Sequence, residues 1–331
     1  MKKLNILLTA LLASSVYAQD LVMTVGELPA PAQIDKVLSA GPPSDVLLLA
    51  IAPEKMAGTA GFDMQSKRGA MFPAELQKLP LLGKISGKGS TLSMEKIVEI
   101  RPRLIVDSGN VTANYQGQAQ RTFEQTNVPY ILVDGHLANT PASLRALGKV
   151  LGSERAEKLA QYADETLAQA EKFAKTQPSR SFFVARNADG LQTGQKGSIH
   201  TEALELAGLK NVVEGEQQGL VQVSLEQLLL WQPDMIFTQY EQFAENLASN
   251  PQWQGLRAVQ NKKVFLLPNK PFGWLDSPPS LNRLLGVRWL VHHLSGKADA
   301  DFVQQIQQFY KLFYHIDLNA EQAQELLPRT L

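Results

Sequence analysis

The chain contains no cysteine among its 331 residues. This absence excludes disulfide bonds, thiolate metal sites and cysteine nucleophiles. It also excludes the lipid-modified N-terminal cysteine that tethers some exported proteins to a membrane. Basic and acidic residues balance at 32 each, so the net charge is zero and we expect no nucleic-acid partner.

Long hydrophobic runs are scarce as well. Residues 4–13 form one directly after two lysines, but about ten apolar residues are too few to span a hydrocarbon core of roughly 30 Å. Residues 16–18 fit the small-x-Ala pattern of a signal-peptide cleavage site. We therefore predict a signal peptide over residues 1–18, cleavage near Ala18, and a soluble protein in the periplasm of a double-membraned bacterium.

Motifs of catalysis and metal binding are missing too. The five histidines show no His-Glu-x-x-His or other close metal spacing, and no Gly-x-Ser-x-Gly or Gly-x-Gly-x-x-Gly is present. Residues 83–91 resemble a phosphate-binding loop, but only three residues separate Gly83 from Gly87 and no strand precedes them. We read this segment as an ordinary loop, and we expect no resident cofactor and no enzyme activity.

An ungapped internal repeat is the most informative positive feature. Residues 93–106 read SMEKIVEIRPRLIV and residues 224–237 read SLEQLLLWQPDMIF. Each unit has a serine suited to an N-cap, a glutamate at the second helical position, a short amphipathic helix, a proline and an apolar run typical of a buried strand. The offset of 131 residues approaches the length of a domain, which indicates two similar α/β lobes with a ligand cleft between them.

Helical patterns alternate with short apolar strands over most of the chain, which is typical of parallel sheets. The exception is a strand-free stretch within residues 140–175, whose apolar residues share one helical face from residue 153 onward. A helix over residues 153–175 spans roughly 33 Å, so it could join two lobes or pack wholly on one. We predict an N-terminal lobe over residues 19–140, linking helices over 141–176 and a C-terminal lobe over 177–331.

The chain resembles the class III (helical-backbone) periplasmic binding proteins of ABC importers, which deliver ferric siderophores, haem, cobalamin and related metal species. The two repeat units carry the resemblance, together with residues 197–211, the linking helix and the aromatic segment 272–283. It covers nearly the whole mature chain. It implies two Rossmann-like lobes with parallel sheets, joined by one long backbone helix, with the ligand cleft between them.

The resemblance also implies partners. Glu95 and Glu226 match the family's glutamates that dock onto arginines of the permease dimer, although simple complementation of the helix dipole explains the same residues. We expect a monomer that carries a small metal-containing ligand as an intact complex or oxyanion. A ferric siderophore is the first choice of cargo, molybdate or tungstate the second and cobalamin the third. The rival from another class is an exported α/β enzyme with an active site between the lobes.

Ligand contacts are expected in polar or aromatic loops at strand ends and helix starts. Arginine and lysine in the segment 58–73 suit an anion, and the loop 268–279 joins a strand to a helix, where open α/β sheets hold ligands. Trp274 is expected to face the cleft, although a role as a core anchor is the alternative. The full set of candidates is Ser44, Lys67, Arg68, Ser108, Asn110, His200, Tyr240, Trp274, Asp276 and Arg283.

Overall fold

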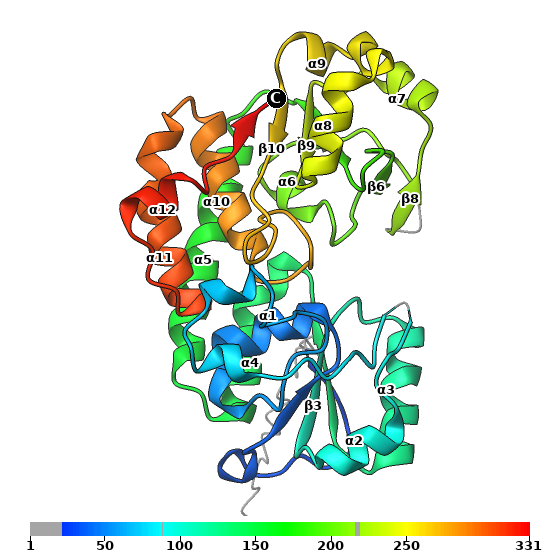
Figure 1. Cartoon of the computed structure of the whole chain (residues 1–331), viewed down its shortest axis with the longest axis vertical. Coiled ribbons are helices and arrows are strands. Elements are labelled where there is room, and N and C mark those ends of the chain that lie inside the picture. The colour runs from blue at the N-terminus through cyan, green and yellow to red at the C-terminus, as the bar shows by residue number, and fades with distance from the viewer. Residues whose placement is uncertain (1–21, 88, 216–218) are drawn as a thin grey trace, which may run out of the picture.

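The computed structural model describes residues 22–87, 89–215 and 219–331, so the predicted signal peptide lies outside the described residues. Two α/β lobes lie one above the other, and a set of helices runs along one side of both (Figure 1). The predicted architecture of two lobes joined by a long helix is confirmed. No helix within the described ranges combines the length and the apolar character that crossing a membrane requires.

The N-terminal lobe is built on a four-stranded sheet of order β1-β4-β3-β2. Strands β2 (Val37–Ser39), β3 (Leu104–Gly109) and β4 (Tyr130–Asp134) are parallel, as predicted, and every residue of β2 and β3 is buried. Strand β1 (Val22–Val25) pairs antiparallel with β4, which the sequence did not predict. The helices of this lobe are α1 (Pro42–Ile51), α2 (Met94–Ile100), α3 (Ala113–Thr126) and α4 (Thr140–Leu151).

The C-terminal lobe repeats this plan with a five-stranded sheet of order β11-β10-β9-β5-β7. Its central strands are parallel, and the edge strand β11 is antiparallel to β10. A separate two-stranded sheet pairs β6 with β8. The strands are β5 (Ser181–Ala185), β6 (Gln192–Gly194), β7 (Lys210–Asn211), β8 (Leu220–Gln222), β9 (Met235–Thr238), β10 (Val264–Leu266) and β11 (Arg329–Thr330), and the helices are α6 (Glu202–Leu206), α7 (Leu225–Trp231), α8 (Glu241–Ser249) and α9 (Arg257–Gln260).

The sequence repeat corresponds to equivalent structures in the two lobes. Helix α2 is capped by the Ser93 hydroxyl and helix α7 by the Ser224 hydroxyl, each accepting a backbone N–H three residues on at 3.2 Å. Each helix then ends at a residue in the left-handed conformation, Arg101 or Gln232, and leads through a proline into a buried strand. Both predicted N-caps are confirmed.

The linking helix α5 (Arg155–Ala174) has 20 residues and contacts both lobes. It packs on α1 and α4 of the N-terminal lobe and on α6 of the C-terminal lobe. The chain after residue 282 adds α10 (Arg283–Leu294), α11 (Val303–Tyr314) and α12 (Ala320–Gln324) on the same side, and α11 packs on α1. One hydrophobic core runs through both lobes and these helices, which couples the lobes more tightly than a single helix would.

Candidate functional site

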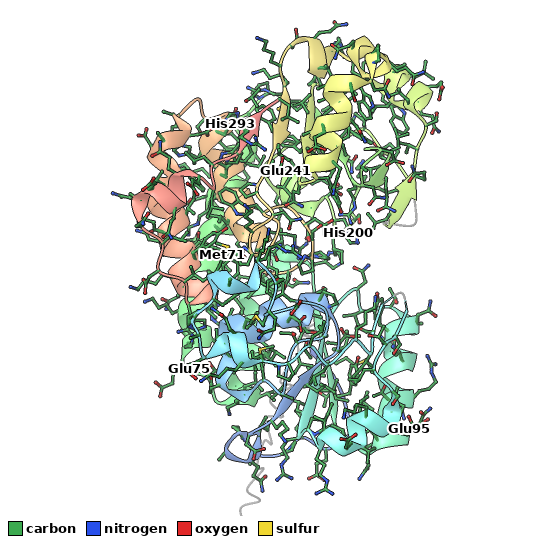
Figure 2. All side chains as sticks on the ribbon, in the orientation of Figure 1. Met71, Glu75, Glu95, His200, Glu241 and His293 are labelled. Carbon is green, nitrogen blue, oxygen red and sulfur yellow. The ribbon has the colours of Figure 1, made fainter. Side chains whose placement is uncertain are left out.

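A pocket of about 330 Å³ lies where the lobes meet. Both lobes line it, which is the arrangement expected of a cleft site. His200, one of its residues, lies at the level of this junction in Figure 2. The N-terminal lobe contributes Pro42, Gly61, Phe62 and Arg68, and the C-terminal lobe contributes Arg186, His200, Phe272, Asp276, Ser277, Pro278 and Pro279.

A buried carboxylate holds the N-terminal wall of this pocket in place. Asp45 on α1 accepts the backbone N–H groups of Ala60, Gly61 and Phe62 at 2.7, 2.9 and 3.2 Å. Desolvation by burial raises the pKa of Asp45 to about 6, although these hydrogen bonds act in the opposite direction. The loop that carries Arg68 is thus fixed to α1, and the exposed Arg68 guanidinium lies 5.5 Å from the centre of the Phe62 ring.

The C-terminal wall is a charged cluster from three separate segments. Arg186 directly follows β5 and forms an ion pair with Asp276, which is buried in the loop between β10 and α10. His200, just before α6, places its Nδ1 3.0 Å from the second Asp276 oxygen. Burial lowers the pKa of His200 to about 3, and the nearby Arg186 and Arg283 act in the same direction. His200 is therefore neutral at pH 7.

The charges in this pocket favour an anion. Arg68 and Arg186 contribute two positive charges, Asp276 contributes one negative charge and His200 is neutral. The surplus is one positive charge, and it comes from Arg68, which has no carboxylate partner among the described residues. Guanidinium groups offer the planar donor geometry that oxyanions and carboxylates accept.

The two aromatic rings that line this pocket pack against each other. Phe62 is 5% exposed and Phe272 is 2% exposed, and their ring centroids lie 4.7 Å apart across the lobe boundary. The prediction that Trp274 faces the cleft is wrong. Its side chain is 1% exposed, and its Nε1 donates a hydrogen bond to the Tyr310 hydroxyl at 3.4 Å. The alternative reading as a core anchor is correct, because burial of the large apolar indole holds the loop on α11.

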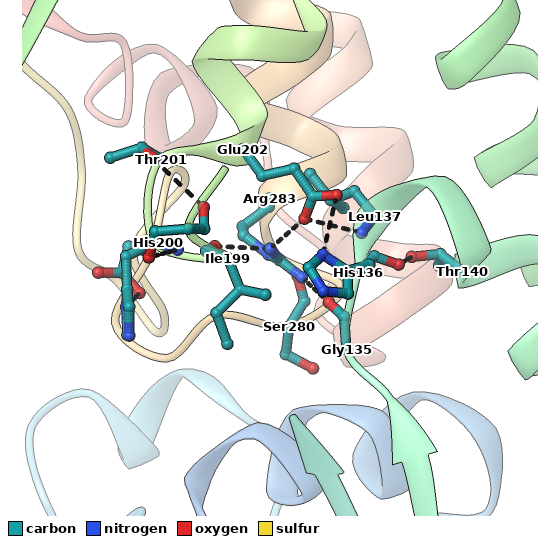
Figure 3. A network of polar contacts seen from close by, with 12 residues as sticks. Gly135, His136, Leu137, Thr140, Ile199, His200, Thr201, Glu202, Ser280 and Arg283 are labelled. Carbon is teal, nitrogen blue, oxygen red and sulfur yellow. Dashed lines mark hydrogen bonds and ion pairs between the residues drawn. The ribbon is translucent and has the colours of Figure 1, made fainter. Parts of the chain in front are cut away.

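Arg283 is also buried rather than at the rim of the cleft. Its guanidinium donates to the Ile199 carbonyl at 2.7 Å, to Glu202 at 3.1 Å and to the Gly135 carbonyl of the N-terminal lobe (Figure 3). Glu202 in turn accepts the Leu137 backbone N–H at 2.9 Å. This polar network joins the lobes at the base of the cleft. Arg283 does not line the interlobe pocket, and its prediction as a ligand contact is therefore corrected.

The structure separates the remaining candidates from the pocket. Ser44 is fully buried at the start of α1, where its hydroxyl donates to the Gly41 carbonyl at 2.8 Å, so the predicted ligand contact there is also corrected. Ser108 lies near the end of β3 and Asn110 directly follows that strand, and neither is among the residues that line the pocket. Tyr240 does not line the pocket either, and its ring centroid lies 5.9 Å from the Arg186 guanidinium.

A second groove adjoins the pocket. It has a volume of about 630 Å³, and its lining includes Lys67, Arg68, Met71 and Glu241. Met71 and Glu241 are labelled in Figure 2. Lys67 therefore faces this groove rather than the interlobe pocket, whereas Arg68 lines both. The groove extends the space available beside Arg68.

Three of the candidates predicted from the sequence, Arg68, His200 and Asp276, line this pocket, and Arg186 lines it without having been a candidate. A signal for Arg186 was available. It is the first residue after a predicted buried strand, which is the position where parallel sheets present ligand contacts.

Glu95 and Glu226 lie apart from the pocket, on α2 and α7. Both side chains are exposed. Hydrogen bonds from their own backbone N–H groups and from the N-cap serines lower the pKa of each glutamate. Both helices lie on the side of the molecule away from the linking helix, one on each lobe (Figure 1).

Comparisons with known proteins agree with this two-lobed fold. A solved ABC transporter solute-binding protein from Sulfurospirillum deleyianum superposes with a TM-score of 0.80 at 29% identity, covering 90% of this chain and 95% of that one. The vitamin B12-binding protein of Pectobacterium atrosepticum is 30% identical over 212 residues, which are 59% of this chain and 71% of that protein.

A further relative is the molybdate-binding protein MolA of Haemophilus influenzae. It is 31% identical over 125 residues, and the match spans only 35% of its length. The structure of MolA bound to molybdate superposes with a TM-score of 0.70 at 19% identity, covering 88% of this chain and 96% of that one, which shows a shared fold. The family model described as periplasmic binding protein matches residues 39–271. The chain belongs to the family of periplasmic binding proteins.

Proposed function

We propose that this protein is the substrate-binding protein of an ABC importer, and that its interlobe pocket captures a small metal-centred oxyanion such as molybdate or tungstate. The observation that carries the proposal is the surplus positive charge of a 330 Å³ pocket in which Arg68 and Arg186 approach from opposite lobes. The protein acts by binding and delivery, and the family match favours this role over catalysis. Its site of action is the periplasm, after export.

The aromatic residues support a small cargo over a ring-bearing one. A corrin, haem or catecholate ligand gains affinity by stacking on exposed aromatic faces. Phe62, Phe272 and Trp274 are all at least 95% buried, so they offer little surface for such stacking. Two charged guanidinium groups suit a compact, multiply charged anion better.

A ferric siderophore, the cargo expected first from the sequence, is the second candidate. One observation favours it: Arg68 lines both the interlobe pocket and the adjoining groove of about 630 Å³. A larger anionic chelate could place a charged group at Arg68 and extend along that groove.

Glu95 and Glu226 are proposed to dock the two lobes onto a two-fold permease. They occupy equivalent positions in the repeat, with the same serine cap and the same exposure. An equivalent carboxylate on each lobe is the arrangement that matches a partner built from two equal subunits.

Titration calorimetry on the mature protein tests the cargo. We expect molybdate and tungstate to bind, and a ferric hydroxamate siderophore and cyanocobalamin to bind far more weakly. Thermal stabilisation by the bound ligand, which grows as RT ln(1 + [L]/Kd), gives an independent measure. Tight binding of the siderophore without binding of either oxyanion would replace the first candidate by the second.

A further inference from the structure

His200 lines the interlobe pocket, and within the described part of the chain only one of its two ring nitrogens has a partner. Its Nδ1 lies 3.0 Å from an Asp276 oxygen, and the other Asp276 oxygen pairs with Arg186. A carboxylate held by a guanidinium is a hydrogen-bond acceptor, so the proton of the neutral imidazole is on Nδ1. The other ring nitrogen, Nε2, is then unprotonated, and it has no hydrogen-bond partner among the described residues.

This tautomer is held firmly. The backbone that carries Asp276 is fixed, because its carbonyl accepts a hydrogen bond from the Gln239 side chain at 3.1 Å and the neighbouring Leu275 N–H donates to the same side chain at 2.7 Å. A carboxylate behind Nδ1 and an open Nε2 is the arrangement that orients metal-binding histidines and raises their basicity.

A lone pair at this position discriminates between anions. Sulfate is fully deprotonated at pH 7 and offers only oxygen lone pairs, which repel the lone pair of Nε2. In an anion built around a metal, the metal can accept an additional ligand. The lone pair of Nε2 can then form a bond to that metal. Arg68 and Arg186 compensate the negative charge of either anion, so they do not distinguish the two.

We propose that His200 Nε2 bonds directly to the metal centre of the cargo and thereby selects metal-centred anions over sulfate. The inference rests on the proposed function and names the chemistry of the same pocket. The step is a simple addition: the Nε2 lone pair forms one dative bond, the metal increases its coordination number, and no bond breaks and no electron is transferred. Asp276 is the positioning residue, because it acts through the imidazole.

X-ray absorption at the molybdenum edge tests this bond on the mature protein loaded with molybdate. Free molybdate is tetrahedral and gives an intense pre-edge peak. We expect the bound ion to lose much of that intensity and to show a nitrogen ligand. An unchanged tetrahedral spectrum for bound molybdate would overturn direct ligation while leaving the proposed function intact.

Two variants separate ligation from simple charge attraction. His200→Gln replaces the lone pair by an amide that can donate to an oxyanion, so a purely hydrogen-bonded site would keep its affinity, whereas we expect molybdate affinity to fall at least tenfold. Asp276→Asn removes a negative charge beside the anion, so charge attraction alone predicts tighter binding. We expect instead a loss of about 10–100-fold, as for other partners behind metal-bound histidines.

Sulfate is the control ligand for the wild type, His200→Gln and Asp276→Asn. We expect the wild type to bind it at least a hundredfold more weakly than molybdate, and His200→Gln to narrow that ratio. Equal affinity of the wild type for the two anions would contradict the inference. If the wild type binds neither molybdate nor tungstate, the proposed function fails and the inference fails with it. Should either variant not fold, the wild-type spectrum decides alone.

Discussion

The Arg283 guanidinium and the Glu202 carboxylate lie 3.1 Å apart at the junction of the two lobes, and each also bonds to the backbone of the N-terminal lobe. Arg283 is 1% exposed. Together with the continuous hydrophobic core, this pair fixes how the lobes face each other. We therefore expect binding to use a largely preformed pocket, with only modest closure of the lobes.

Replacing this arginine should destabilise the whole molecule. We expect Arg283→Met to lower the free energy of unfolding by about 3–5 kcal/mol, because it leaves the Glu202 carboxylate without its buried partner. Urea unfolding measures the loss. Arg145→Met is the matched control, since Arg145 bonds to Glu157 and Asp164 at the surface and should matter much less. Equal effects of the two substitutions would contradict the structural role of Arg283.

Arg68 should matter for cargo binding, and its neighbour Lys67 should not. Of these two residues, Arg68 lines the interlobe pocket and Lys67 does not. A hydrogen bond to a charged group is worth about 1.5–3 kcal/mol, so we expect Arg68→Met to weaken molybdate binding about ten- to a hundredfold and Lys67→Met to leave it within a few-fold. Calorimetry on both variants checks this, and the reverse order would move the binding site into the adjoining groove.

Trp274 should contribute to the stability of the fold and should make no direct contact with the ligand. We expect Trp274→Ala to reduce the free energy of unfolding by about 3–5 kcal/mol through loss of buried contacts. The fluorescence difference between the wild type and Trp274→Phe isolates this indole, and we expect molybdate to leave that difference unchanged. Strong quenching of it by molybdate would show that the indole reaches the cargo.

His200 should make stability depend on pH. Its pKa is about 3 in the folded state, whereas an ordinary solvated histidine, as in the unfolded chain, has a pKa of 6.5. Below pH 6.5 the unfolded chain therefore binds a proton that the folded protein does not, and the folded state loses stability as the pH falls from 6.5 toward 3. From pH 7 to pH 5 the loss from this group is about 2 kcal/mol.

The difference between wild type and His200→Gln isolates this contribution from those of Asp45 and His136, whose pKa values are raised and act in the opposite direction. The groups that face His200 are Asp276, Arg186 and Arg283, and all are retained in the variant. Urea unfolding at pH 7 and pH 5 provides the measurement. If both proteins lose the same stability over this range, His200 is not held neutral.

The two repeat glutamates should affect transport without affecting binding. We expect Glu95→Ala with Glu226→Ala to keep molybdate affinity, because neither side chain lies at the pocket, and to abolish uptake in cells. Glu99→Ala with Glu245→Ala is the control, since these glutamates are also exposed, one on α2 and one on α8. Normal uptake by the first double variant would disprove the docking assignment.

Local features of this protein follow from its sequence. Serine caps, short amphipathic helices and apolar strands recur 131 residues apart because capping and strand burial depend on neighbouring residues, and both units fold as the pattern predicts. The same local reasoning identified α5 and the loops that carry Arg68, His200 and Asp276.

Only the tertiary structure decided which of the candidate residues face the cleft. Trp274 and Arg283 lie in a loop and a helix start that look exposed in the sequence, yet both are buried against segments far away in the chain. The cluster of Arg186, His200 and Asp276 likewise joins three distant segments, and its charge depends on contacts between them. Desolvation and ion pairing depend on which residues lie close together in space, and the order of residues along the chain does not specify this.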